Sequence, residues 1–284
     1  MAIVFENVTH VFMPGSPFMT TAIKDISLTI DGGSFVGMIG HTGSGKSTLI
    51  QHINGLLKPT QGKVVVDGIN TAVKGDLKKL RRLVGLVFQY PEHQLFEETV
   101  EKDVGFGPKN MGLSGQEIKE RVLRALTQVG LTGDEILARS PFELSGGQRR
   151  RVAIAGVLAM EPQVLILDEP TAGLDPRGRE EVLALVKRIH EERHCTVIMV
   201  SHSMDEVARV ASRVIVMNRA EIAIDGTPRE VFARAAELRE IGLDIPAVAQ
   251  LTAELQSRGE AVPPGIMTIE EMRDWIVERL AHHA

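Results

Sequence analysis

Apolar and polar residues alternate over two segments near the start of the chain. Positions 2–12 and 22–30 follow the two-residue period of a strand that buries one face, and a loop containing proline and glycine separates them. A loop of that composition favours a reversal of chain direction. The pattern therefore predicts two antiparallel strands.

The next segment loses this alternation. Residues 35–39 form a short continuous apolar run, which is followed by a glycine-rich loop and by a helical pattern over 47–55. Such a run is typical of a strand that is buried on both faces. Further strands are predicted at 63–66 and 83–88.

Strand patterns are missing between residues 97 and 139. Ser114 and Glu117 have the spacing of a capping box, and apolar residues recur at helical spacing after them until Gly130. We therefore expect a helical subdomain inserted at about 92–160.

A rhythm of strands and helices returns in the second half of the chain. Val, Ile and Leu fill its strand segments without alternation, which is typical of a parallel sheet covered on both faces. Helices are predicted at 176–193 and after Ser203, which has Glu206 at capping-box spacing. Strands are predicted at 164–167, 196–200 and 214–217.

The last part of the chain is predicted to be helical and acidic. One helix opens at Thr227, and two further helical patterns follow, the second capped by Thr268 and Glu271. From residue 221 onwards there are 12 acidic residues, 6 Arg and no Lys, a net charge of −6, against about +1 for the rest of the chain. This change predicts a main domain at 1–235 and a C-terminal annex at 236–284.

Composition and charge limit the classes of protein to consider. With 284 residues, 43% of them hydrophobic, the chain is long enough to bury a full core, and its single cysteine, Cys195, has no partner within the chain. No apolar run approaches the ~20 residues of a membrane helix, and the net charge of −5 argues against nonspecific binding to nucleic acid. We expect a chain in a reducing cytoplasm that crosses no bilayer by itself and has no nucleic-acid partner.

The loop after residues 35–39 carries the strongest chemical motif. The sequence Gly40-His41-Thr42-Gly43-Ser44-Gly45-Lys46-Ser47 matches G-x-x-x-x-G-K-[ST] and stands between a predicted strand and a predicted helix, which is the context of a phosphate-binding P-loop. The backbone and the helix N-terminus would surround a phosphate, Lys46 would reach the β- and γ-phosphates, and the Ser47 hydroxyl would ligate Mg²⁺. Together with Thr48, this loop predicts a site for ATP and Mg²⁺.

Two carboxylates end the strand at 164–167. Asp168 and Glu169 would lie at the carboxyl edge of a parallel sheet, beside the P-loop. Asp168 can then meet a metal held by Ser47, while Glu169 can orient or deprotonate a water aimed at the γ-phosphate. We expect Asp168 to be a metal ligand and Glu169 to be the general base.

A second anion-binding helix terminus is predicted at Leu144-Ser145-Gly146-Gly147-Gln148. A serine and two small residues there precede three arginines and a helical run. One nucleotide needs only one P-loop. We therefore expect this second terminus to contact a nucleotide that is held by the P-loop of another subunit.

Together these motifs resemble the nucleotide-binding subunits of ATP-binding cassette transporters. The resemblance covers about residues 2–235 and implies an α/β fold: a P-loop NTPase with a RecA-like parallel sheet core, an N-terminal antiparallel β subdomain, the inserted helical subdomain and a small C-terminal helical annex. It rests on the order and spacing of the P-loop, Gln89, residues 144–148, Asp168-Glu169, Gly173-Leu174-Asp175 and His202.

The resemblance also implies roles for single residues. Phe12 falls where the family has an aromatic ring, usually Tyr, that stacks on adenine; a plain core Phe is the alternative. Gln89 corresponds to the glutamine that touches Mg²⁺ or water and senses the membrane partner, and His202 to the histidine that hydrogen-bonds the γ-phosphate. Asp175 corresponds to an acidic residue at the dimer interface, with an ordinary helix N-cap as the alternative.

A finer resemblance is to the ATP-binding subunits of energy-coupling factor transporters, which import vitamins or transition-metal ions. In that family the segment after Gln89 lines a groove for helices of a membrane subunit, so Leu95 and Phe96 are expected to be exposed for docking, with core packing as the alternative. The residues that carry this resemblance are 89–96, 98–100, 103–108 and 150–156.

Partners and location follow from the same resemblance. It implies a dimer around two ATP, with a second ATPase subunit paired through the annex, a transmembrane coupling subunit and a substrate-capturing membrane subunit. The chain would lie peripherally on the cytoplasmic face of the cell membrane. The motif sequences are most like those of the second of the paired ATPase subunits, while the choice between homodimer and heterodimer stays open.

Several other functions compete with this one. The chain could serve an importer fed by an extracytoplasmic binding protein. DNA-repair ATPases of this class carry long coiled-coil insertions, whereas residues 90–143 show no sustained heptads, and translation factors carry tandem cassettes. The segment from His190 to His194 matches the zinc-protease pattern H-E-x-x-H, but His194 is expected beyond the end of the helix, which favours a solvated helix end.

Overall fold

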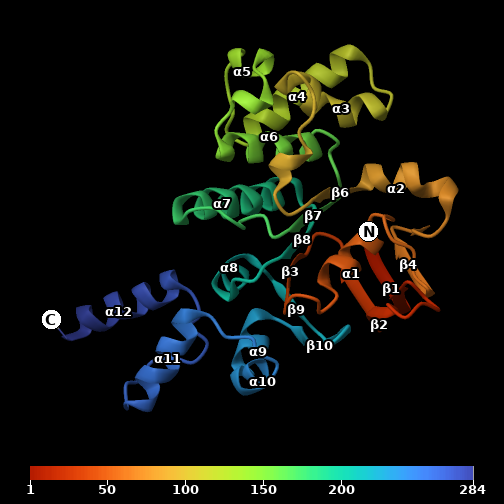
Figure 1. Cartoon of the computed structure of the whole chain (residues 1–284). Helices are drawn as coiled ribbons and strands as arrows, with labels where there is room; N and C mark the ends of the chain where they lie inside the picture. Colours follow the sequence, from red (N-terminus) through yellow and green to blue (C-terminus); the bar gives the residue numbers. More distant parts are fainter. Residues whose placement is uncertain (284) are drawn as a thin grey trace.

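Two β-sheets and a larger number of helices make up the described part of the molecule (Figure 1). The structure is a computed structural model that describes residues 1–283, so the last residue of the predicted annex at 236–284 lies outside the described residues. No helix within residues 1–283 is long and apolar enough to cross a membrane.

The N-terminal sheet is antiparallel, as the alternation predicted. Its strands lie in the order β2-β1-β4-β5. Ile3, Phe5 and Ile30 are among its buried residues, while the alternate positions face outwards. The strands are β1 (Ala2–Phe12), β2 (Thr20–Asp31), β4 (Gln61–Val66) and β5 (Ile69–Asn70).

The second sheet has six strands in the order β10-β9-β3-β8-β7-β6. Its first five strands along the chain run parallel, which confirms the prediction, and β10 pairs antiparallel with β9. The alternation in β1 and β2 extends over the predicted segments, but β10 was missed because only Ile224 in it is buried. The strands are β3 (Phe35–Gly40), β6 (Val84–Val87), β7 (Val164–Asp168), β8 (Thr196–Val200), β9 (Arg213–Asn218) and β10 (Glu221–Gly226).

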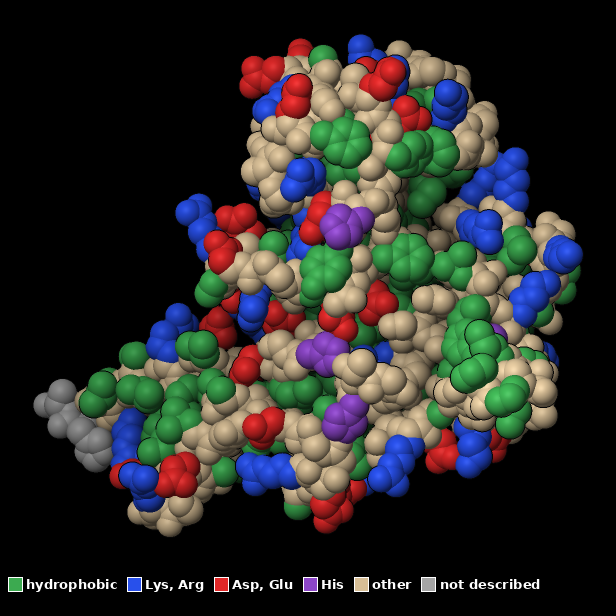
Figure 2. Space-filling view, in the orientation of Figure 1, with side chains coloured by type: hydrophobic (Ala, Val, Ile, Leu, Met, Phe, Trp, Pro, Cys, Tyr) green, Lys and Arg blue, Asp and Glu red, His purple; other side chains and the backbone are tan. Residues whose placement is uncertain are grey.

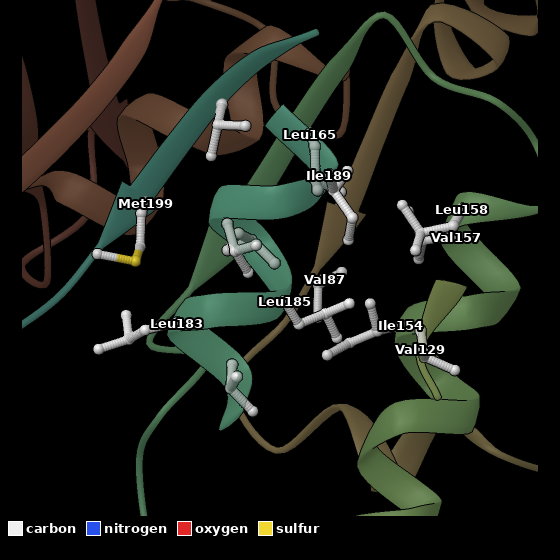
Figure 3. Packing of buried hydrophobic residues seen from close by; sticks show 14 of the residues in the cluster. Val87, Val129, Ile154, Val157, Leu158, Leu165, Leu183, Leu185, Ile189 and Met199 are labelled. Carbon is white, nitrogen blue, oxygen red and sulfur yellow. The ribbon is translucent and has the colours of Figure 1, made fainter. Parts of the chain in front are cut away.

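Successive residues of the parallel strands pack into two different cores. Leu165 and Leu167 belong to one apolar cluster, and Val164 and Ile166 to the other. The first core receives α7 (Pro176–Arg193), α8 (Met204–Val210) and the helical subdomain. Figure 3 shows residues of this core from α7 and from the helix α6 (Gly146–Leu158) of that subdomain. The second receives the antiparallel sheet, α1 (Lys46–Ile53) and α2 (Leu77–Leu83), which follows the short turn η1 (Lys74–Asp76).

A group of helices separates β6 from β7 along the chain (Figure 1). The predicted capping box is present, because the Ser114 hydroxyl accepts from the N–H of Glu117 and the Glu117 carboxylate accepts from the N–H of Ser114. Gly130, at φ +72°, follows the helix end. The helices are η2 (Pro91–Gln94), α3 (Val100–Asn110), α4 (Gly115–Gln128), α5 (Glu135–Ala138), η3 (Pro141–Glu143) and α6 (Gly146–Leu158).

The C-terminal part is helical, with one more helix than the pattern predicted. The extra helix, α10, has six residues and buries Leu238 alone, too little for a periodic signal. The last two helices share a small core of Val248, Val262, Ile266 and Met272. The four helices are α9 (Pro228–Ala233), α10 (Ala235–Glu240), α11 (Ala247–Ser257) and α12 (Ile269–His283).

Candidate functional site

The glycine-rich loop connects the end of β3 to the start of α1. Gly40 has φ +152° and Gly45 has φ +108°, and a Cβ would lie 2.3 Å from the Met217 carbonyl oxygen at the first and 2.4 Å from the Ala22 carbonyl oxygen at the second. Both positions therefore require glycine for conformation and for space. No side chain caps the start of α1, so its first N–H groups are available to an anion.

Lys46 and Ser44 are buried in this loop. The Lys46 ammonium donates to the carbonyl oxygens of Gly40 (2.7 Å) and His41 (2.8 Å). Burial lowers the pKa of Lys46, while the charges of Glu169 and Asp168 act in the opposite direction. The Ser44 hydroxyl is buried with no hydrogen-bond partner among the described residues. A cationic loop with an unpartnered buried hydroxyl fits a phosphate group.

Glu169 is held between two side chains at the ends of neighbouring strands. Its Oε2 accepts from Gln89 Nε2 at 2.9 Å, and its Oε1 lies 2.8 Å from His202 Nε2. The three residues follow β6, β7 and β8, which are adjacent in the sheet. A carboxylate has no proton to donate when it is ionised, so His202 Nε2 carries the hydrogen in this pair.

Asp168 ends β7 next to the P-loop. Its side chain is buried, and burial raises its pKa, whereas a hydrogen bond with Ser47 and the charge of Lys46 act to lower it. A hydroxyl and a carboxylate held side by side are the hard oxygen ligands that Mg²⁺ prefers. The predicted grouping of Ser47, Lys46, Asp168 and Glu169 is therefore present.

A buried carboxylate that sequence reasoning treated as a helix cap supports these strand ends. Glu206 Oε2 accepts from the hydroxyls of Thr171 (2.9 Å) and Ser201 (2.7 Å). The Ser203 hydroxyl does cap α8, but the Ser203 N–H donates to Ser201 and not to Glu206, so the expected reciprocal cap is absent from this helix. The spacing of Ser203 and Glu206 correctly predicted the start of α8. It did not predict that the Glu206 carboxylate bonds to Thr171 and Ser201.

Residues 144–148 start α6 in the helical subdomain. The Ser145 hydroxyl accepts from the N–H of Gln148, and the Gln148 side chain accepts from the N–H of Ser145. Leu144 is buried. No hydrogen bond joins this segment to residues 40–48 in the described part of the chain.

The structure is compatible with both of the alternatives that the sequence left open for Phe12 and for Asp175. Phe12 ends β1, is 41% exposed and packs edge-on against the His10 ring at 4.5 Å, so its ring is accessible. Asp175 caps α7 by accepting from the N–H of Gly178 at 2.7 Å, which is the ordinary N-cap role.

One expectation about the segment after Gln89 is wrong. Phe96 is 58% exposed, but Leu95 is 6% exposed and packs in the core. Phe96 stacks edge-on against Phe106 at 4.9 Å beside a groove of about 680 Å³. The groove has apolar walls from Leu95, Ala153 and Met160 and a rim of Lys74, Lys78, Arg81 and Arg82.

The H-E-x-x-H segment is the end of a helix, as expected. α7 ends at Arg193, and His194 takes a left-handed conformation at φ +50°. The His190 ring bonds to the carbonyl oxygen of Cys195. No group of three or more His, Cys, Asp and Glu side chains that could hold a metal ion exists within residues 1–283.

Comparisons with known proteins agree with this geometry. A family profile described as ABC transporter matches residues 23–172. The energy-coupling factor transporter ATP-binding protein EcfA2 of Caldanaerobacter subterraneus subsp. tengcongensis is 56% identical over 281 residues, covering 99% of this chain and 98% of its own length. The protein of the same name from Clostridium perfringens is 54% identical over 279 residues, covering 98% of each.

Solved structures show the same fold. The structure of cbiO1 from Clostridium perfringens, described as part of the ABC transporter complex cbiONQ, has a TM-score of 0.74 and 39% identity, covering 88% of this chain and 98% of its own. The ATP-binding cassette MJ0796, solved as a dimer in a post-hydrolysis state bound to ADP and Pi, has a TM-score of 0.71 and 32% identity, covering 80% of this chain and 98% of its own.

Proposed function

The chain belongs to the ATP-binding cassette transporter family, and on that premise we propose that it is the ATP-hydrolysing subunit of an energy-coupling factor transporter that imports a vitamin or a transition-metal ion. The observation that carries the proposal is the position of Glu169, held by Gln89 and His202 beside the P-loop. The similarity of almost the whole chain to ATP-binding subunits of energy-coupling factor transporters supports this choice of transporter class.

In this proposal the P-loop binds the phosphates of ATP. Its backbone N–H groups and Lys46 hold them, and the buried Ser44 hydroxyl gains the partner it lacks. Ser47, Asp168 and Gln89 would hold Mg²⁺, which neutralises phosphate charge when it is bound. Phe12 stacks on adenine. The remaining residues of the site are His41, Thr42, Gly43 and Thr48.

Hydrolysis is assigned to the residues at the strand ends. Glu169 orients the attacking water and takes its proton. The Nε2–H of His202, which donates to Glu169 in this structure, would donate instead to the γ-phosphate when ATP is bound. Gln89 holds one carboxylate oxygen of Glu169 and fixes its direction. Gln89 also starts the segment that leads to the groove. A movement of the membrane partner in the groove can therefore change the position of the Glu169 carboxylate through Gln89.

Two copies of such a site form when two subunits pair. Residues 144–148 lie in the helical subdomain, and in our proposal they meet a nucleotide on the P-loop of the partner ATPase, with Asp175 at the interface. The annex pairs the subunits through exposed apolar side chains of its helices, which Figure 2 shows gathered at the lower left. They include Leu251, Ile269, Ile276, Val277 and Leu280.

The membrane partner is assigned to the groove beside Phe96. An amphipathic helix of a transmembrane coupling subunit fits its apolar walls and basic rim, and a substrate-capturing membrane subunit completes the transporter. The chain then lies peripherally on the cytoplasmic face of the cell membrane.

Replacing the base tests the assigned chemistry. Glu169→Gln keeps the shape of the side chain but removes its basicity, so we expect ATP binding to persist and hydrolysis to fall by at least about a hundredfold. Glu191→Gln, an exposed carboxylate on α7, is the control and should hydrolyse ATP normally. A Glu169→Gln variant that binds ATP and hydrolyses it at the wild-type rate would refute the role of Glu169.

The transporter class is tested by what accompanies the chain. Purification from native membranes in mild detergent should recover a second ATPase subunit, a coupling membrane subunit and a small substrate-capturing membrane protein. Recovery of a permease together with an extracytoplasmic binding protein would indicate the other importer class. A soluble partner, with ATPase activity stimulated by DNA or ribosomes, would contradict a transport function.

A further inference from the structure

One arginine connects three segments that lie far apart in the sequence. Arg150, on the first turns of α6, is 3% exposed. Its Nε and Nη2 donate to the two carboxylate oxygens of Glu92, each at 3.1 Å. Its Nη1 donates to the carbonyl oxygens of Pro170 (3.2 Å) and Ala172 (2.9 Å).

The arrangement is specific to a guanidinium. A buried cation is costly unless its donors are satisfied, and here donors on two edges of the planar guanidinium are used. Burial acts to raise the pKa of Glu92, but the hydrogen bond and charge of Arg150, together with a backbone hydrogen bond and the charge of His93, more than offset it, so the pKa lies below its usual value, which favours an ionic pair. A lysine offers one point charge and cannot make the same four bonds.

The segment that receives Nη1 is the one that follows the base. Pro170 and Ala172 lie one and three residues after Glu169, which itself takes a left-handed conformation at φ +51°. The position of Glu169 therefore depends on how the 170–172 backbone is held. Thr171, between the two carbonyls, is fixed separately by Glu206.

The other end of the connection lies next to the groove. Glu92 belongs to η2. Gln94 at the end of that turn, and Leu95 and Phe96 after it, line the groove of about 680 Å³. Ala153, one turn after Arg150 on α6, lines the same groove. A helix seated there would contact the residues on both sides of the Glu92–Arg150 pair.

We propose that Arg150 is a positioning residue that couples occupancy of the groove to the hydrolytic site, by linking Glu92 to the backbone that carries Glu169. Movement of η2 is passed through the guanidinium to residues 170–172. The inference rests on the proposed function in one respect, namely that a membrane subunit fills the groove. The link between Arg150 and hydrolysis does not depend on that subunit.

The first experiment measures hydrolysis by the purified ATPase. Arg150→Lys keeps the charge and most of the volume, and we expect its kcat to fall by about ten- to a hundredfold with little change in KM for ATP, because a base displaced by a fraction of an ångström loses rate. Glu92→Gln should lower kcat in the same direction. The two effects should be strongly less than additive in the double variant, because both remove one connection.

A matched pair elsewhere serves as the control. Arg213 also makes two bonds to one carboxylate, Asp225 on β10, and a third to the Thr29 carbonyl oxygen. It starts β9, which β3 and β8 separate from β7, the strand that Glu169 follows. Arg213→Lys should lower the thermal unfolding midpoint without changing kcat. Equal kcat losses in the two arginine variants, or a change in Arg150→Lys confined to the unfolding midpoint, would overturn the proposal.

The second experiment uses the complete membrane complex. There, transported substrate should stimulate ATP hydrolysis in the wild type and in Arg213→Lys, and the stimulation should be lost in Arg150→Lys and Glu92→Gln. Stimulation that survives in both variants would overturn the coupling role. If no membrane subunit accompanies the wild type, the proposed function fails, while the kcat result on the purified ATPase still decides the role of Arg150.

Discussion

At the scale of single residues, the C-terminal region touches the P-loop directly. The His41 ring contacts the turn between α10 and α11. Its Nε2 bonds to the carbonyl oxygen of Ile241 in that turn. The next residue, Gly242, has φ +69°, and a Cβ there would lie 3.0 Å from His41 Cε1. The second residue of the phosphate loop is therefore braced by a segment two hundred residues away.

A pair of glycine substitutions separates this contact from backbone strain. Gly242→Ala forces a left-handed alanine and pushes on His41, so we expect ATP binding to weaken by about three- to tenfold. Gly259→Ala is the matched control, because Gly259 has φ +88° and open space around its missing Cβ. Both variants should lose similar stability in thermal unfolding. Equal ATP affinities in equilibrium titrations would show that the contact does not reach the site.

Single residues also show where sequence reasoning stops. The P-loop and the acidic pair could be predicted because each is a local motif whose chemistry lies within a few residues. Arg150 and Glu206 could not be assigned, because each has a partner that only the fold brings near: Glu92 lies 58 residues from Arg150, and Thr171 lies 35 residues from Glu206. Leu95 and Phe96 are neighbours of similar character, and local pattern did not distinguish the buried one from the exposed one.

At the scale of elements, the start of α12 depends on one carboxylate. Glu271 Oε2 accepts from the N–H groups of Met267 (2.8 Å) and Thr268 (3.1 Å), and its Oε1 accepts from Arg229 (3.1 Å). Burial acts to raise the pKa of Glu271, but the hydrogen bonds from these N–H groups, from Arg229 and from the Thr268 side chain together more than offset it, so its pKa lies below the usual value. The cap was predicted from Thr268 and Glu271, whereas the contribution of Arg229 on α9 needed the tertiary structure.

This cap makes the stability of the annex depend on pH. A carboxyl whose pKa is lower in the folded state stabilises the fold above its unfolded pKa of about 4.3, and the contribution disappears as pH falls through the folded value. Glu271→Gln should therefore loosen α12 at pH 7 by about 1 kcal/mol, measured by amide hydrogen exchange. The difference from wild type should narrow as pH falls below about 4.3, towards the lower folded pKa. Glu240→Gln, an exposed annex carboxylate, should behave as wild type, and a pH-independent difference would contradict this assignment.

At the scale of the whole molecule, three surfaces of the chain are open to contact with other subunits. The P-loop and residues 144–148 lie in different parts of one chain, the groove beside Phe96 is open, and α11 and α12 extend away from the six-stranded sheet (Figure 1). Val277 is 59% and Leu280 64% exposed on α12. Apolar side chains gathered in this way are typical of a surface that is buried in an assembly.

A charge placed on this face tests its role in pairing. Val277→Lys should weaken association of the ATPase subunits by about tenfold or more, measured by sedimentation velocity across a dilution series. Leu123→Lys places the same charge on α4, at a residue that is 39% exposed, and should leave association unaltered. Both variants should retain the wild-type circular dichroism. Unchanged association of Val277→Lys would place the pairing surface elsewhere.

The reciprocal cap at the start of α6 has a kinetic consequence for such an assembly. Ser145 and Gln148 already satisfy each other's N–H groups in the single chain, so this helix start is ordered before any partner arrives. A segment that is shaped in advance gives up little chain entropy on contact. Closing and reopening can then proceed as the docking and release of rigid bodies, at rates set by collision and orientation and not by refolding of the contact segment in every cycle.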